Sequence, residues 1–218
     1  PQQDLLARLG VFAGVFTLDA AEWIAEGIAD GDVLDDLAGL VDGSLVRQQD
    51  HGERAVFTML STVREYAVVQ LQERGVLEEI RDRDAPLLHQ PRRARRARAR
   101  GGAGQVEWIE RLADEGDNLR LAARHLLDAR RWADAARFAW LLYVYWWVDG
   151  HLGEVRGGWM REVLESGDEL DDLTRATALY FTLAIGFWQD PDDHLVPGLE
   201  ESATLFGREG GERSGEAL

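Results

Sequence analysis

Apolar side chains recur along the first part of the chain with the spacing of short helices. Positions three and four residues apart lie on one face of a helix. Three runs follow this pattern: Leu5, Leu9 and Phe12; Ala21, Ile24, Ala25 and Ile28; and Leu34, Leu37, Leu40 and Val41. The pattern therefore predicts three short amphipathic helices that share one core.

Two short apolar runs then predict a β-hairpin and a closing helix. Residues 45–46 and 55–60 flank the polar segment 47–54, which contains Gly52 and is expected to be the turn. After Ser61 the helical period resumes, with Val63, Tyr66, Ala67 and Leu71 on one side. Thr62 and Glu65 have the spacing of a capping box, which predicts that the closing helix begins there.

Three helices, a hairpin and a closing helix make up a winged-helix domain, which we expect over residues 1–75. The segments LLARLGVFAGVFTLDAAEWIA, VLDDLAGLVDGSLV and FTMLSTVREYA resemble the winged-helix domain of bacterial STAND (NB-ARC) regulators, ATP-binding transcription factors of the LuxR-like and SARP-like kinds. In that family the domain follows a nucleotide-binding domain. The resemblance implies that this domain packs on such a domain, which would hold ATP or ADP and lies outside this chain.

The same resemblance points to candidate domain-interface residues where the hairpin joins the closing helix. Members of the wider class carry there a nucleotide-sensing Met-His-Asp motif, in place of which this chain has Met59, Leu60 and Ser61. Related bacterial regulators have Leu-Glu-Thr, whose last residue Thr62 keeps, and a Val-Arg-Glu-Tyr-Ala sequence that this chain shares. The candidate interface is Met59, Ser61, Thr62, Arg64 and Glu65. A solvated pair beside an apolar stripe is the alternative for the last two.

Val76, Leu77 and Ile80 continue the helical pattern, which Pro86 and Pro91 then interrupt, and residues 76–103 are expected to be a linker or an irregular, Arg-rich segment. Six Arg lie between Arg92 and Arg100. This basic run can be a patch for nucleic acid or another anionic surface, although no aromatic residue is interleaved for base stacking. It can also be a flexible linker or a solvated helix. A third alternative is a compensated frameshift, because the relatives have a smooth amphipathic helix in this place.

From residue 104 to the end, helical patterns follow one another with short breaks. The apolar positions predict helices around residues 106–112, 119–127, 132–147, 152–163, 176–187 and 195–206, with a looser segment over 207–215. Asp149-Gly150 and Ser166-Gly167 are typical helix ends. The family resemblance, carried by EWIERLADEGDNLRLAARHLL, implies a truncated tetratricopeptide-like helical array. The whole chain is therefore predicted to be mainly α.

Helical arrays bind partners along one face, and large aromatic residues can anchor such contacts. Four candidates for an interaction surface lie close together: Tyr143, Tyr145, Trp146 and Trp147. Burial between helices is the competing interpretation for each Trp. We expect the helical array to bind a protein partner or a small-molecule inducer.

Composition narrows the function further. The net charge is −16, from 24 basic and 40 acidic residues, and no Cys is present. Disulfides, thiolate zinc sites and Cys nucleophiles are therefore excluded. No signal peptide or membrane-spanning run is found, so we expect a cytoplasmic protein with no membrane contact. The chain begins at Pro1 without Met, and we expect it to be a fragment.

Nucleic-acid binding and catalysis are both disfavoured by the side chains present. The helix that would read DNA carries Asp32, Asp35 and Asp36 with no Arg or Lys, so we expect no direct contact of this fragment with nucleic acid. The five His are scattered, and no phosphate-binding loop or nucleophile motif occurs, so no active site, bound metal or cofactor is expected. Asp190, Asp192 and Asp193 fit a helix start.

The sequence thus predicts a non-catalytic regulatory and sensor fragment of a bacterial ATP-dependent transcriptional regulator. In this hypothesis, the helical array senses a ligand or protein and the winged helix passes the change to the nucleotide-binding domain. One alternative is a stand-alone helical-repeat scaffold that binds another protein. Another is a DNA-binding winged-helix protein that uses the Arg run.

Overall fold

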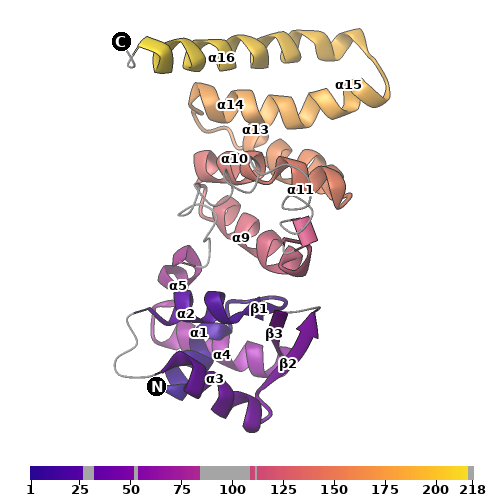
Figure 1. Cartoon of the computed structure of the whole chain (residues 1–218). Coiled ribbons are helices and arrows are strands. Elements are labelled where there is room, and N and C mark those ends of the chain that lie inside the picture. Colours follow the sequence, from indigo (N-terminus) through magenta and orange to yellow (C-terminus); the bar gives the residue numbers. More distant parts are fainter. Residues whose placement is uncertain (27–31, 52–53, 84–108, 111, 216–218) are drawn as a thin grey trace. The chain divides into compact units, whose positions relative to one another are not determined.

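The computed structural model describes residues 1–26, 32–51, 54–83, 109–110 and 112–215. They form a mainly helical structure with one small sheet (Figure 1). Contacts divide the chain into two compact units. Unit 1 contains residues 1–86 and 106–122, and unit 2 contains residues 87–105 and 123–218.

Unit 1 has the element order of a winged helix, which confirms the predicted fold. Its elements are α1 (Gln2–Leu9), β1 (Phe16–Thr17), α2 (Leu18–Ala25), α3 (Val33–Asp42), β2 (Val46–His51), β3 (Arg54–Met59), α4 (Ser61–Glu73) and α5 (Leu77–Arg83). The strands are antiparallel in the order β1-β3-β2. Strand β1 was not predicted, because two residues are too few to show an alternating pattern.

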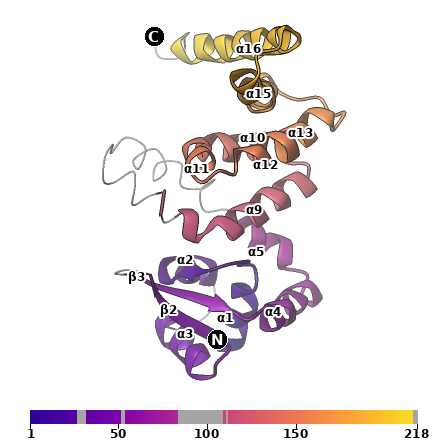
Figure 2. The same cartoon turned by 90° about the vertical axis from the view of Figure 1, so that its right-hand side faces the viewer.

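Strands β2 and β3 form a hairpin, which is the wing of the winged helix. Its strands are longer, and its turn is shorter, than the sequence pattern predicts. Strand β2 pairs with β3 from Val46 opposite Met59 to His51 opposite Arg54, so the strands run through most of the predicted turn (Figure 2). The predicted eight-residue turn is therefore wrong. Because β2 is an edge strand, its polar residues 47–50 remain exposed, and their polarity resembled that of a loop.

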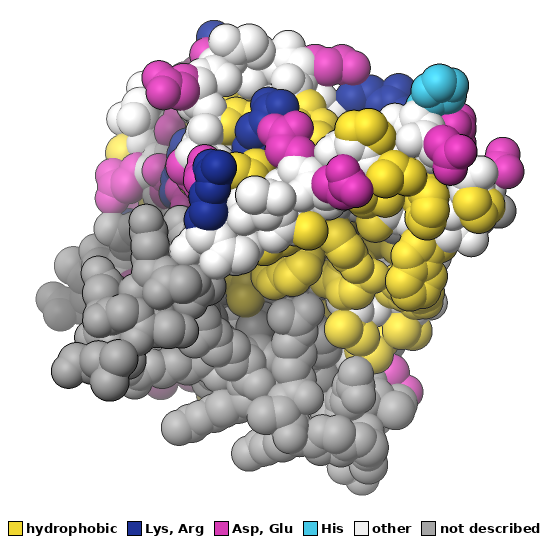
Figure 3. Space-filling view, turned by 90° about the horizontal axis from the view of Figure 1, so that it is seen from above, with side chains coloured by type: hydrophobic (Ala, Val, Ile, Leu, Met, Phe, Trp, Pro, Cys, Tyr) yellow, Lys and Arg dark blue, Asp and Glu magenta, His cyan; other side chains and the backbone are white. Residues whose placement is uncertain are grey.

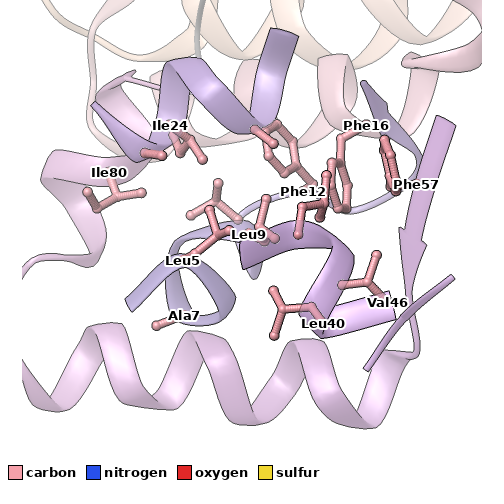
Figure 4. Close-up of a cluster of buried hydrophobic side chains, with 14 of the residues drawn as sticks. Leu5, Ala7, Leu9, Phe12, Phe16, Ile24, Leu40, Val46, Phe57 and Ile80 are labelled. Carbon is pink, nitrogen blue, oxygen red and sulfur yellow. The ribbon is translucent and has the colours of Figure 1, made fainter. Parts of the chain in front are cut away.

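The core of unit 1 lies between the helices and the sheet. Phe12 stacks on Phe16, with ring centroids 4.9 Å apart, and Phe16 stacks on Phe57 at 5.9 Å. Leu5 and Leu9 reach the same core from α1 (Figure 4). The core also includes Leu77 and Ile80 of α5, so packing continues into the segment predicted to be a linker. The Arg92–Arg100 run lies outside the described residues.

Helix α4 begins without the predicted capping box. The helix starts at Ser61, directly after Leu60 in an extended conformation, and no side chain caps its first turn. Strand β3 continues to Met59, so the strand-to-helix change occurs before Thr62 can occupy the cap position. At the other end, Gly75 follows the helix with a left-handed φ of 70°.

The second half of the chain is built of helical segments. The first of them, α9, begins in unit 1 and ends in unit 2, because the boundary lies between residues 122 and 123. The segments are α9 (Gly116–Asp128), α10 (Trp132–Leu141), α11 (Tyr143–Val148), α12 (Leu152–Glu154), η1 (Val155–Met160), α13 (Arg161–Glu165), α14 (Asp172–Leu179), η2 (Tyr180–Ala184), α15 (Ile185–Gln189), η3 (Asp193–Leu195) and α16 (Val196–Gly215). Residues 109–110 and 112–114 are also helical, in the place of the first predicted helix.

Four predicted helices differ in detail from those observed. The one predicted over 132–147 is divided at Leu142 into α10 and α11, and two others contain the π-helical turns η1 and η2. Helix α16 continues to Gly215, so the predicted loosening after residue 206 is wrong. Gly150 and Gly167 have left-handed φ values of 80° and 73°, which confirms both predicted helix ends.

Within unit 2, α14 packs against both α10 and α16 (Figure 1). Ser202 of α16 is buried and donates a hydrogen bond to the carbonyl of Ala176 in α14, 2.8 Å away. Leu179 and Leu205 pack in the same interface. The structure is compatible with the predicted tetratricopeptide-like array, which stays a prediction.

Candidate functional site

The carboxylates of α3 have local structural roles. Asp32 precedes the helix, and its Oδ1 accepts a hydrogen bond from the Leu34 N–H at 2.9 Å. Asp35 and Asp36 lie in the first turn, where negative charge complements the positive end of the helix dipole. Leu37 and Leu40 point into the core. These acidic residues therefore help to start the helix.

The wing presents the polar side chains that α3 lacks. Arg47, Gln48 and Gln49 follow one another along β2, and all three are exposed. The buried residue Val46 precedes them and holds the start of the strand in the core. A guanidinium and two carboxamides are groups that contact phosphates and base edges. The wing therefore offers a candidate nucleic-acid interface.

The candidate domain-interface residues lie at the start of α4. Ser61, Thr62 and Glu65 are exposed and Arg64 is half-buried, whereas Met59 packs partly against the core. The structure adds three exposed apolar neighbours that the sequence analysis did not select: Leu60, Tyr66 and Val69. Tyr66 was predicted on the apolar side of the closing helix with Ala67 and Leu71, and this prediction is wrong, because Tyr66 is 60% exposed while the other two are buried. The helical period alone could not separate a residue at the edge of the buried side from one within it.

The structure separates the four aromatic candidates. Tyr145 and Trp146 are fully buried, and the Trp146 indole packs against Trp159 with centroids 5.1 Å apart. Burial removes these two from any accessible surface. Tyr143 is half-buried and Trp147 is 50% exposed, so their role in an interaction surface stays a prediction.

Further aromatic rings extend the surface around Tyr143. Its hydroxyl lies 3.3 Å from that of Tyr180, and its ring meets Trp147 at 5.9 Å between centroids. Burial, reinforced by the hydrogen bond with the Tyr180 hydroxyl, raises the pKa of Tyr143. Trp188 of α15 packs edge-on against Trp147 at 6.1 Å. Sequence analysis missed Trp188, and its only signal was its place beside Asp190-Pro191.

A second residue that sequence analysis missed as a contact is Asn118. This buried side chain at the start of α9 accepts a hydrogen bond from the Gly14 N–H at 2.9 Å and donates one to the Val15 carbonyl at 2.6 Å. A Cβ at Gly14 would lie 3.2 Å from Asp117 Cβ, a tight contact that glycine avoids. The sequence feature that could have pointed to Asn118 is its place in the Asp-Asn-Leu-Arg sequence.

The part of the chain that the structure describes has neither a metal site nor a membrane span. No group of three or more His, Asp or Glu side chains there could hold a metal ion. None of the helices described is long and apolar enough to cross a membrane.

Comparison with known proteins identifies the N-terminal domain. Residues 1–72 match the family model of the winged helix-turn-helix domain. An uncharacterized protein of Mycobacterium tuberculosis is 36% identical over 111 residues, which cover 50% of this chain and 27% of that protein. Another, named "Putative HTH-type transcriptional regulator", is 32% identical over 173 residues, covering 75% of this chain and 18% of that protein. No solved structure matches the chain.

The chain therefore contains a winged helix-turn-helix domain at its N-terminus, and its similarity to a regulator supports a regulatory role. It spans less than a third of the length of either relative. The STAND, NB-ARC, LuxR-like, SARP-like and tetratricopeptide assignments stay predictions.

The same match contradicts the prediction that this fragment makes no direct contact with nucleic acid. That prediction rested on the carboxylates of one helix. In the structure these carboxylates cap and start α3, while Arg47 and the two Gln side chains are exposed on the neighbouring wing. The prediction considered only this helix and took no account of the side chains on the hairpin strands.

Proposed function

We propose that this chain is the winged-helix and helical-array part of a cytoplasmic transcriptional regulator, and that the winged helix contacts DNA through its wing. The observation that carries the proposal is the exposed stretch Arg47, Gln48 and Gln49 on the edge strand of a winged helix-turn-helix domain, in which Arg47 and Gln49 point to one face of the strand and Gln48 to the other. Arg pairs with phosphate or guanine, and Gln can pair with adenine.

The charge of α3 decides how the domain approaches DNA. In most helix-turn-helix proteins the corresponding helix enters the major groove. Here Asp35 on the exposed surface of α3 would meet the phosphates at close range, where like charges repel. An approach led by the wing keeps Arg47 nearest to the duplex and these carboxylates farther away.

Fluorescence anisotropy with a labelled duplex of about 30 base pairs tests this proposal. The 218-residue chain should bind at low salt, and log affinity should fall linearly with log salt concentration, with a slope of about −0.9 for each phosphate contact. Arg47→Ala should weaken binding and reduce that slope by about one contact.

Arg137 of α10 provides the matched control, because it is also an exposed arginine but lies outside the wing. Arg137→Ala should leave both the affinity and the salt slope unchanged. Absence of binding at low salt, or equal losses in the two variants, would refute DNA contact by the wing.

A second candidate function, compatible with the first, comes from the exposed apolar residues beside and on α4. Leu60, Tyr66 and Val69 are 42%, 60% and 44% exposed, beside the candidate interface residues 59–65. Such neighbours favour contact with another domain. We propose that this domain is the nucleotide-binding domain of the family resemblance, which would hold ATP or ADP.

Sequencing the gene upstream of Pro1 tests the second candidate. An in-frame phosphate-binding loop followed by the rest of an ATPase domain would support it. If the neighbouring coding sequence lacks such a domain, α4 would need another partner. In the proposed regulator, the helical array receives the signal from a protein or a small molecule.

A further inference from the structure

Three aromatic rings form an exposed corner where α11 meets α15. We define the aromatic corner as Tyr143, Trp147 and Trp188. The ring plane of Trp147 is inclined at 69° to that of Tyr143 and at 78° to that of Trp188. Trp147 is 50% exposed and Trp188 is 75% exposed, so both indoles offer surface to a ligand.

Carboxylates follow both exposed Trp residues along the chain. Asp149 comes two residues after Trp147 and Asp190 comes two residues after Trp188; both are exposed, and Asp149 Oδ2 also lies 3.0 Å from His151 Nε2. Asp192 and Asp193 are exposed as well. The space-filling view shows hydrophobic side chains gathered over one area of the described surface, with acidic side chains at its border (Figure 3).

This combination selects for positive charge. The face of an indole attracts a cation through its quadrupole, and nearby carboxylates add Coulomb attraction. We propose that the aromatic corner binds an Arg or Lys side chain from a cationic peptide segment of a partner protein. The inference rests on the proposed role of the array as the part that receives the signal.

Charge complementarity argues against two other occupants. Nucleic-acid bases can stack on Trp, but the adjoining phosphates would face Asp149 and Asp190. A second copy of the chain would bring the same acidic border against itself, and each copy carries a net charge of −16. In a peptide that alternates leucine with arginine, the leucine side chains can pack on the apolar surface and the arginine side chains can pair with the carboxylates beside it.

Binding of a fluorescein-labelled peptide of alternating Leu and Arg to the 218-residue chain tests the proposal. A matched peptide has Glu in place of Arg. We expect the Arg peptide to bind, the Glu peptide not to bind, and Trp188→Ala to weaken binding of the Arg peptide by about tenfold or more. Trp188 is so exposed that its substitution should leave the fold intact, as circular dichroism can verify.

Two controls separate this site from general charge attraction and from the wing. Tyr66→Ala removes an exposed aromatic residue of α4, and Arg47→Ala changes the proposed DNA contact; both should keep the affinity for the Arg peptide. Failure of the wing experiment would leave this measurement unaffected. No binding of the Arg peptide at low salt, equal binding of both peptides, or an unchanged affinity in Trp188→Ala would overturn the proposal. Single-stranded DNA binding that depends on Trp188 would also overturn it.

Discussion

Asn118 and Gly14 are 104 residues apart in the chain, yet one hydrogen bond joins them. The Asn118 carboxamide acts as acceptor and donor at once, so it satisfies two backbone groups in the segment between α1 and β1. A buried amide that bridges two backbone groups specifies one geometry, because any displacement leaves polar groups without partners.

Substitution of Asn118 should therefore destabilise unit 1. We expect Asn118→Ala to lower the free energy of unfolding by about 1–3 kcal/mol, since two backbone groups lose a partner. Chemical denaturation followed by circular dichroism measures this change. Asp117→Ala on the same helix turn is the control and should cost under about 1 kcal/mol, because its ion pair with Arg120 is on the surface. Equal stability of Asn118→Ala and the wild type would contradict the assignment.

At the scale of elements, a bidentate ion pair joins α9 to α13. Arg124 Nη1 donates to Glu162 Oε2 at 2.8 Å, and Nη2 donates to Oε1 at 2.7 Å. The pKa of Glu162 lies below its ordinary value, mainly because of these hydrogen bonds from Arg124. Arg124 also bonds to Asp128 at 2.9 Å within α9. The pair fixes the orientation of both side chains.

The pH dependence of stability follows from the lowered pKa of Glu162. A carboxylate whose pKa falls on folding stabilises the protein above its unfolded pKa, and this contribution is lost as pH falls through the folded pKa. The stability difference between wild type and Glu162→Gln should thus be constant above about pH 5 and shrink in more acidic solution.

The size of this effect should be modest, at most about 1 kcal/mol, because both side chains are about two-fifths exposed. Urea unfolding at a series of pH values measures it. Glu165→Gln, an exposed substitution on the same helix, should show no comparable pH-dependent difference. A constant difference between wild type and Glu162→Gln through the acidic range would contradict the prediction.

At the scale of the whole molecule, each unit has its own buried aromatic residues. Phe16 lies in the core of unit 1 and Trp146 in that of unit 2, and each is at most 1% exposed. Separate hydrophobic cores commonly unfold as separate cooperative units. Calorimetry of the 218-residue chain should therefore resolve two transitions.

Core substitutions should shift these two transitions selectively. Phe16→Ala and Trp146→Ala each remove a large buried ring, which costs about 3–5 kcal/mol, and each should lower the melting temperature of its own unit only. Trp147→Ala, at a half-exposed neighbour, should have a smaller effect. A single transition that Phe16→Ala and Trp146→Ala lower equally would show that the units unfold together.

Much of the fold could be predicted because it depends on local periodicity. The helices of the winged-helix domain have apolar residues on one side, so the spacing of Leu5 and Leu9, or of Leu37 and Leu40, predicts which side is buried. Glycines that follow helices are equally local signals, as Gly150 and Gly167 show. The interruption at Leu142 carries no comparable signal, since apolar residues continue across it.

The sequence by itself determined the winged-helix order, the helical character of the second half and the absence of cysteine chemistry, because these depend on residue type and spacing alone. Only the tertiary structure decided which aromatic residues are accessible. Tyr145 and Trp146 are buried while Trp147 and Trp188 are exposed, although all four belong to aromatic or apolar runs. Accessibility depends on which helix packs against each ring, and the partners of Asn118 and Trp147 come from segments distant in the chain.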